Sequence, residues 1–319
     1  MKRRHALSAL AAAAAWSPAI RAQGSYPSRP ITLICPWPPG GGADTQLRML
    51  AKLMSASLGQ QVVIENRPGA TGSLGAAALM QAKPDGYTLA QSHNGVLRQP
   101  FIAPTPYDPL KDFTYIIGVS DNPFGIVVRD DRPWRTLEQF IQYAKTNPGK
   151  VNIAVPGRGS PGHLVSDQVA AQFDLKWTTV PYRGTANSMQ ALLAGEVDAA
   201  AESTGWVPFV ESGKARLLAV LGRQRLRKFP NTPTLVEQKI NASDFSPWGI
   251  VAPAGLDPAI AQRLHDTIRR AMDSSEFIEL LATFAQEPIY MSPAAYLQYV
   301  RETVPQQKVI VDRYNLKST

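Results

Sequence analysis

Residues 31–44 read Ile-Thr-Leu-Ile-Cys-Pro-Trp-Pro-Pro-Gly-Gly-Gly-Ala-Asp, and this stretch decides the fold class. The short apolar run at 31–35 is rich in β-branched residues, which predicts a buried strand. Residues 43–58 then place apolar side chains at helical spacing, which predicts an amphipathic helix. A strand that passes through a glycine loop into a helix is typical of the start of an α/β unit.

The same alternation continues along the chain. Strands are expected at 61–65, 87–90, 151–155, 177–180, 197–200, 217–221 and 248–252, and helices at 73–82, 136–146, 162–172, 185–194, 257–272 and 292–314. Strands that alternate with helices favour mostly parallel sheets with helices on both faces.

The N-terminus has the pattern of an export signal. Met1–Arg4 is basic, Ala6–Ala15 is a short apolar run, and Ala22 is a small residue at the expected cleavage position. We therefore expect residues 1–22 to be a signal peptide and the mature protein to be periplasmic. Arg3-Arg4 leaves both the general secretory and the twin-arginine routes open.

Composition excludes several classes of protein. The single Cys excludes a disulfide framework and a multi-cysteine zinc site, and no run reaches the ~18–20 apolar residues of a membrane span. Removal of residues 1–22 takes away four basic and no acidic residues, so the net charge falls from +8 to +4. The basic stretch 223–228 has no interleaved aromatic residues, which favours a solvated loop over a nucleic-acid site.

The length of the mature chain, about 300 residues, favours two lobes over one sheet. We expect one crossing between lobes near residues 120–123 and a return between 222 and 233. The expected division is a signal peptide at 1–22, a first lobe from 23–121 plus 222–319, and a second lobe from 122–221.

The glycine loop at 36–44 is a candidate anion site. Three consecutive glycines let backbone N–H groups approach a ligand closely, and the N-terminus of the following helix favours negative charge. The alternative is a tight turn in which Asp44 acts as a capping residue.

A second glycine loop joins the strand 151–155 to the next helix. Gly157, Gly159 and Gly162 match the pattern G-x-G-x-x-G of dinucleotide sites. The following strand, however, ends in Tyr182-Arg183 instead of an acidic residue. We therefore expect a loop for a small anion and no nucleotide cofactor.

Catalytic patterns are weak. Ser160, His163 and Asp167 share a helical face, but a nucleophile with its base seldom comes from one helical turn, and no G-x-S-x-G motif is present. No spacing suggests a metal site. We expect a protein that is not an enzyme, with a secreted hydrolase that uses Ser160 and His163 as an open alternative.

Seven motifs, in the same order along the chain, resemble the Bug-type solute receptors of the tripartite tricarboxylate transporter family. The similarity covers about residues 26 to 255, with a looser helical match beyond. The motifs lie at 26–31, 65–75, 83–89, 107–113, 180–184, 193–198 and 252–255.

This resemblance implies a periplasmic binding protein-like (type II) fold, with a ligand cleft between two α/β lobes. It also implies a monomer that captures a small organic acid by hinge closure, without a cofactor, and delivers it to a membrane permease. A ligand-sensing subunit for a kinase ectodomain remains an alternative. The ligand-binding positions that it implies are Trp37, Pro38, Pro39, Gly40, Gly41, Gly42, Ala43, Ser92, His93, Asn94, Gly159, Ser160, His163, Tyr182, Arg183, Gly184, Thr185 and Glu202.

Some of these positions depart from the family pattern. Trp37 stands where Phe is usual, Arg183 where Lys is common, and Glu202 where Asp is common. His93 lies in a loop that usually carries small residues. If Arg183 faces the cleft, we expect it to favour a second carboxylate on the ligand.

Overall fold

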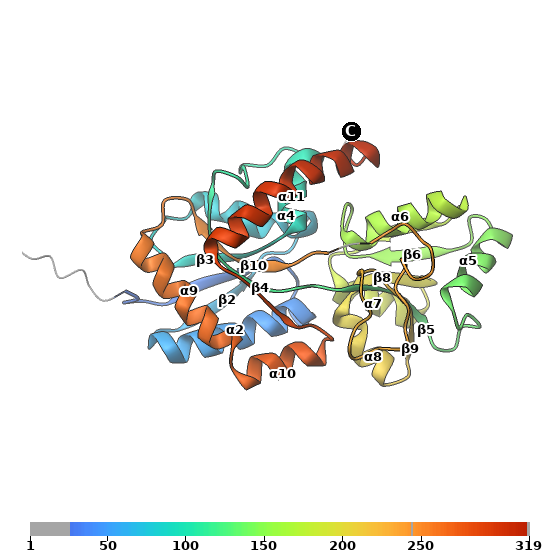
Figure 1. The fold of residues 1–319 in the computed structure, drawn as a ribbon, viewed down its shortest axis with the longest axis horizontal. Coiled ribbons are helices and arrows are strands. Elements are labelled where there is room, and N and C mark those ends of the chain that lie inside the picture. Colours follow the sequence, from blue (N-terminus) through green and yellow to red (C-terminus); the bar gives the residue numbers. More distant parts are fainter. Residues whose placement is uncertain (1–25, 244, 318–319) are drawn as a thin grey trace, which may run out of the picture.

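The computed structural model describes residues 26–243 and 245–317, so the expected signal peptide at 1–22 lies outside the described residues. Two β-sheets organise this part of the chain, each with helices on both faces (Figure 1). None of the helices that the structure describes is long and apolar enough to cross a membrane.

The first sheet has six strands in the order β11-β4-β10-β3-β1-β2. The strands β2 and β3 run parallel to β1 on either side of it, whereas β10, from the C-terminal third, lies antiparallel between β3 and β4. The strands are β1 (Ile31–Cys35), β2 (Val62–Asn66), β3 (Thr88–His93), β4 (Phe113–Ser120), β10 (Trp248–Pro253) and β11 (Pro288–Met291).

The second sheet has five strands in the order β7-β6-β8-β5-β9. Here β6 runs parallel to β7 and β8, and β5 is antiparallel to β8 and β9. The strands are β5 (Phe124–Arg129), β6 (Asn152–Val155), β7 (Thr178–Pro181), β8 (Ala199–Ser203) and β9 (Ala215–Val220).

Helices cover both faces of each sheet because alternate strand residues point to opposite sides. Around the first sheet these are α2 (Gly42–Leu58), α3 (Ser73–Ala77), α4 (Asn94–Ile102), α9 (Pro258–Met272), α10 (Ser275–Thr283) and α11 (Pro293–Arg313). Around the second they are α5 (Leu137–Thr146), α6 (Pro161–Phe173), α7 (Thr185–Ala194) and α8 (Val207–Glu211). Short 3-10 turns lie at Ala70–Gly72, Ala78–Gln81 and Thr204–Trp206.

The helix expected at 43–58 is confirmed as α2. Its apolar stripe packs with β1 and α9 into one core, whereas Ile34 of β1 faces a separate core on the side of α4 and α11. The stripe consists of Leu47, Leu50, Ala51, Met54 and Leu58, all buried.

The expected α/β fold of two lobes is confirmed, but each sheet is mixed, with two parallel pairings beside its antiparallel ones. Apolar runs reveal where strands lie but not their direction, and β10 reverses direction when it enters the first sheet from far along the chain. The sequence patterns also missed β4, β5 and α4. Pro100 lies inside α4, and because proline is unfavourable in a helix interior, the sequence there did not suggest a helix.

The chain passes from the first sheet to the second at residues 121–123, between β4 and β5. After β9 it stays with the second sheet longer than expected, because Leu235, Ile240 and Ala242 pack in the core of that sheet. This packing supports a later return to the first lobe than the expected one between residues 222 and 233. We propose that the second lobe extends from about residue 122 to Ala242.

The close contact between α6 and β8 generates a stability prediction. A Cβ built on Gly162 would lie 1.9 Å from the backbone oxygen of Ala201, so Gly162→Ala must push the helix away from the strand. Overpacking of this kind costs about 1–3 kcal/mol, and we expect a clear loss of melting temperature in calorimetry.

Gly222→Ala is the matched control. A Cβ there would meet its nearest neighbours at 3.7 and 3.9 Å, which is ordinary contact. An equal loss of melting temperature in both variants would contradict this account of the α6–β8 contact.

Candidate functional site

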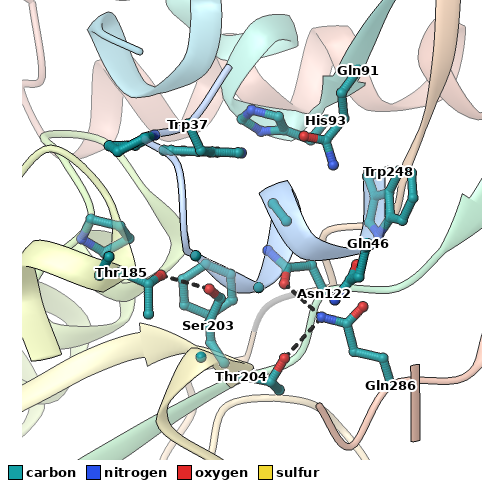
Figure 2. Close-up of a pocket in the computed structure, with 18 residues that line it drawn as sticks. Trp37, Gln46, Gln91, His93, Asn122, Thr185, Ser203, Thr204, Trp248 and Gln286 are labelled. Carbon is teal, nitrogen blue, oxygen red and sulfur yellow. Dashed lines mark hydrogen bonds between the residues drawn. The ribbon is translucent and has the colours of Figure 1, made fainter. Parts of the chain in front are cut away.

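A cavity with a volume of about 50 Å³ lies between elements of the two sheets (Figure 2). The first sheet contributes the loop after β1 and the start of α2, and the second contributes the start of α7 and the end of β8. The lining residues are Trp37, Pro38, Gly41, Gly42, Ala43, Gln46, Gln91, His93, Asn122, Phe124, Pro156, Thr185, Ala186, Ser203, Thr204, Gly205, Trp248 and Gln286.

One wall is the glycine loop that leads into α2. Gly41, Gly42 and Ala43 line the cavity at the helix N-terminus, where free N–H groups and the helix dipole favour an anion. Asp44 takes a separate role, because its buried carboxylate accepts hydrogen bonds from Gly40 N at 3.0 Å and Arg48 Nε at 2.9 Å. The two interpretations of this loop are therefore compatible: Asp44 fixes the turn, and the neighbouring residues face the cavity.

The N-terminus of α7 forms the opposite wall. Thr185 and Ala186 line the cavity there, directly after Gly184, which has a φ of 100°. A Cβ on Gly184 would lie 3.3 Å from Cδ of Pro38 and 3.4 Å from Cε3 of Trp37. The second sheet's helix therefore approaches the first sheet's loop closely, and two helix N-termini line the same cavity.

Four side-chain amides line the cavity, and we call Gln46, Gln91, Asn122 and Gln286 the carboxamide cluster. Gln286 Nε2 donates to Thr204 Oγ1 at 2.8 Å and to Asn122 Oδ1 at 3.3 Å, as the dashed lines in Figure 2 mark. Two buried polar atoms of the cluster, Gln46 Nε2 and Gln91 Oε1, have no hydrogen-bond partner. The cluster can therefore both donate to a ligand and accept from it.

His93 and Trp37 form a stacked pair in the cavity wall, with ring centroids 5.3 Å apart. His93 Nδ1 accepts a hydrogen bond from Gly95 N at 3.1 Å, so the neutral ring carries its proton on Nε2. Burial lowers the pKa of His93 to about 4. At neutral pH the ring is therefore uncharged and supplies an aromatic surface, not a cation.

Glu202 is fully buried behind the cavity wall at the end of β8. Its Oε2 lies 2.7 Å from Oγ1 of Thr185, which lies 2.7 Å from Oγ of Ser203. Burial raises the pKa of Glu202 from 4.5 to about 8. The carboxyl group is therefore mostly protonated at neutral pH, and the hydrogen-bonded chain joins it to two residues that line the cavity.

Arginines gather in a separate depression beside the cavity, which we call the outer groove. Arg158 and Arg183 are exposed there, and Trp37 and Pro156 line both the groove and the cavity. The residues of the outer groove are Trp37, Gly69, Ala70, Thr71, Gly72, Gln99, Ile102, Pro156, Gly157, Arg158, Tyr182 and Arg183.

Seven of the expected ligand positions line the cavity: Trp37, Pro38, Gly41, Gly42, Ala43, His93 and Thr185. Tyr182 and Arg183 lie in the outer groove instead, while Gly184 and Glu202 support the wall from behind. Pro39 and Gly40 are on the exposed side of their loop.

Ser92 and Asn94 do not line the cavity because both are committed to internal packing. The Ser92 backbone oxygen accepts from Tyr296 OH at 3.2 Å, and Asn94 Nδ2 donates to Phe245 O at 2.9 Å. From this strand and helix, Gln91 and His93 of β3 reach the cavity wall instead.

Gly159, Ser160 and His163 also lie away from the cavity lining, so the second glycine loop does not form the expected anion site there. Its polar groups bond to one another: Gly159 N donates to His163 Nδ1 at 3.1 Å, and Ser160 Oγ accepts from His163 N at 3.3 Å. Because Nδ1 already accepts a bond and Nε2 faces Asp167 at 3.8 Å, His163 is not placed as a base for Ser160.

The other eleven lining residues were not among the ligand positions expected from the sequence. Gln46 could have been found, because it lies one helical turn after Gly42 and faces the same side of α2. Asn122 and Gln286 carry no local signal, since only the folded chain brings them together. In the described part of the chain, no cluster of three or more His, Cys, Asp or Glu could hold a metal ion.

Residues 46–316 match the family model described as "Tripartite tricarboxylate transporter family receptor". Among curated proteins, the chain is 42% identical over 323 residues to a Cupriavidus necator protein named for the gbd 5' region, with 99% of each chain covered.

Solved structures show the same fold. The periplasmic binding protein BugD is 29% identical, with a TM-score of 0.87 over 92% of this chain and 100% of that one. A Rhodopseudomonas palustris protein with adipate is 27% identical (TM-score 0.85; 90% and 97% covered). MatC from the same organism, with bound malate, is 28% identical (TM-score 0.83; 90% and 100% covered).

The buried Glu202 generates a pH prediction. The unfolded chain releases this proton near pH 4.5 and the folded protein near pH 8, so the folded state binds more protons in this window and stability falls as pH rises. The loss from this one group approaches ~1.4 kcal/mol per pH unit. Glu202→Gln cannot ionise, so its melting temperature should fall less than that of the wild type between about pH 5.5 and 7.5.

The exposed Glu196→Gln variant is the control, and it should keep the wild-type dependence on pH. If Glu202→Gln also kept the full wild-type dependence, Glu202 would not be the group that retains its proton on folding.

Proposed function

This chain belongs to the receptor family of tripartite tricarboxylate transporters, and we propose that it is a periplasmic receptor that closes around a small carboxylate and hands it to a membrane permease. The observation that carries this proposal is the cavity enclosed by the N-termini of α2 and α7. Relatives with bound adipate and malate support a carboxylate as the chemical class.

In this proposal the ligand's carboxylate lies between the two helix N-termini. Backbone N–H groups at Gly42, Ala43 and Ala186 supply donors, and the aligned peptide dipoles favour the negative charge. Each charge-assisted hydrogen bond contributes about 1.5–3 kcal/mol, so a few of them suffice for the ~8 kcal/mol of micromolar binding. Binding of this kind needs no cofactor and no chemical conversion.

Closure of the two lobes is the proposed conformational step. The contacts that join the lobes in the described structure include Gly184 against Pro38, Thr71 Oγ1 to Arg158 O at 2.8 Å, and Gln286 Nε2 to Thr204 Oγ1 at 2.8 Å. A ligand that bonds to both helix N-termini stabilises the closed state over the open one, which is what hinge closure requires. The permease then recognises the closed receptor.

The first test is a thermal-shift screen of refolded, ligand-stripped mature protein against mono-, di- and tricarboxylates. We expect a subset of these anions to raise the melting temperature, because a ligand that binds only the native state stabilises it. If no carboxylate shifted the melting temperature, the proposed function would be wrong.

A matched pair of variants then locates binding. Ala186 is the second residue of α7 and lines the cavity, whereas Ala259 is the second residue of α9 and is exposed. Ala186→Trp should fill the cavity and abolish the ligand-induced shift, and Ala259→Trp should preserve it. Equal shifts in both variants would place the ligand elsewhere.

The outer groove leads to a kinetic prediction. Because Arg158 and Arg183 lie beside the cavity but outside its lining, we expect them to attract the anion before closure and not to hold it afterwards. Arg183→Gln should lower the association rate constant in stopped-flow fluorescence, weaken its dependence on salt, and leave the dissociation rate unchanged.

The exposed Arg301→Gln variant on α11 removes the same charge away from the groove, and its kinetics should match the wild type. An increase in the dissociation rate of Arg183→Gln would instead mean that Arg183 contacts the bound ligand.

A further inference from the structure

The carboxamide cluster offers hydrogen bonds that the protein itself does not complete. Gln46 is 1% exposed and Gln91 is 3% exposed, and both line the cavity. Gln46 Nε2 and Gln91 Oε1 are nevertheless buried without partners. A buried polar group without a partner costs about 1–3 kcal/mol, so a ligand that supplies both partners recovers this free energy on binding.

The cavity lining offers no cation to a ligand with more than one negative charge. No Lys or Arg occurs among the lining residues in the described ranges, and His93 is neutral. The ionisable groups behind the wall are of both kinds. The acids are Asp44 at the start of α2, Asp121 beside Asn122, and Glu202, which is mostly protonated at neutral pH; a base, Arg98, acts electrostatically on His93. Asp44 is already paired with Arg48 at 2.9 Å.

The two helix N-termini can stabilise one carboxylate, but a second carboxylate in the same cavity would lie against amides and aromatic rings. Removal of that second charge from water without a partner costs several kcal/mol. An uncharged polar group of the same shape would avoid this cost and could use the free atoms of Gln46 and Gln91.

We infer that the ligand of this receptor carries one negative charge and presents an uncharged hydrogen-bonding group, such as a carboxamide or a hydroxyl, to the carboxamide cluster. The inference rests on the proposed function and narrows its substrate class. The carboxylate end faces the helix N-termini, and the neutral polar end faces Gln46 and Gln91.

The outer groove is the competing location for a second carboxylate, because Arg158 and Arg183 lie there. A long dicarboxylate would have to pass Trp37, which lines both spaces and stacks on His93. The experiment therefore has to separate a ligand confined to the cavity from one that extends into the groove.

The test compares dicarboxylates with their half-amides at three chain lengths: succinate with succinamate, glutarate with glutaramate, and adipate with adipamate. Members of a pair share nearly the same shape and differ by one charge. Isothermal titration of the stripped mature protein near neutral pH should give a dissociation constant at least ~10-fold lower for the half-amide in every pair that binds, which corresponds to about 1.4 kcal/mol.

A charge-reversal variant tests the same idea from the protein side. Gln91→Lys places a cation in the cavity, so the preference should move toward the dicarboxylate. Gln298→Lys adds the same charge on the exposed face of α11 and should keep the wild-type preference. If Gln91→Lys does not fold, the comparison of ligand pairs on the wild type decides the question alone.

The possible outcomes distinguish failure of the single-charge inference from failure of the proposed receptor function. A dicarboxylate that binds as tightly as its half-amide, or more tightly, overturns the single-charge inference while the receptor function stands. Loss of that advantage in Arg183→Gln would then assign the second carboxylate to the outer groove. If other monocarboxylates are the only ligands in the thermal screen, the single charge is supported; if no carboxylate binds at all, the receptor proposal itself fails.

Discussion

The close approach of Gly184 to Trp37 and Pro38 is the constraint on which the site depends. Only a residue without a side chain, at a φ that favours glycine, lets the N-terminus of α7 come so near to the loop after β1. With the two helix N-termini held face to face, an anion can be stabilised by backbone groups alone. The side chains of the cavity are then free to be neutral, and in the described lining they are neutral at physiological pH.

Local sequence patterns predicted most of the helices and strands and the wall of the cavity that the first sheet contributes. The strand at 31–35, the glycine loop and the helix after it are continuous in sequence, and their geometry follows from proline, glycine and helical periodicity. Strand direction is a different kind of information. The position of β10 between β3 and β4 depends on a return of the chain after more than a hundred residues in the second sheet, and no residue in 248–253 encodes this.

Because contacts between distant segments are not encoded locally, the ligand-binding residues expected from the sequence also include some that do not line the cavity. Gly159, Ser160 and His163 look like a binding loop in sequence, but their donors and acceptors satisfy one another. Gln91, Asn122 and Gln286 look like ordinary polar residues, and they become a cluster only when β3, the crossing segment and the segment between α10 and β11 meet. Burial likewise decides the charge of Glu202: the sequence shows an acid, whereas the folded environment keeps it protonated. The family resemblance compensated for part of this gap by pointing to Thr185 and His93.

Asn122 lies in the segment that joins β4 to β5, and its amide oxygen accepts a hydrogen bond from Gln286 at the cavity wall. In the proposed function, one of the two connections that bend when the lobes close is therefore also part of the surface that contacts the ligand. A substitution at this position would change the choice of ligand and the balance between open and closed receptor together. Natural or laboratory selection at Asn122 therefore changes ligand preference and the open–closed balance together, not one without the other.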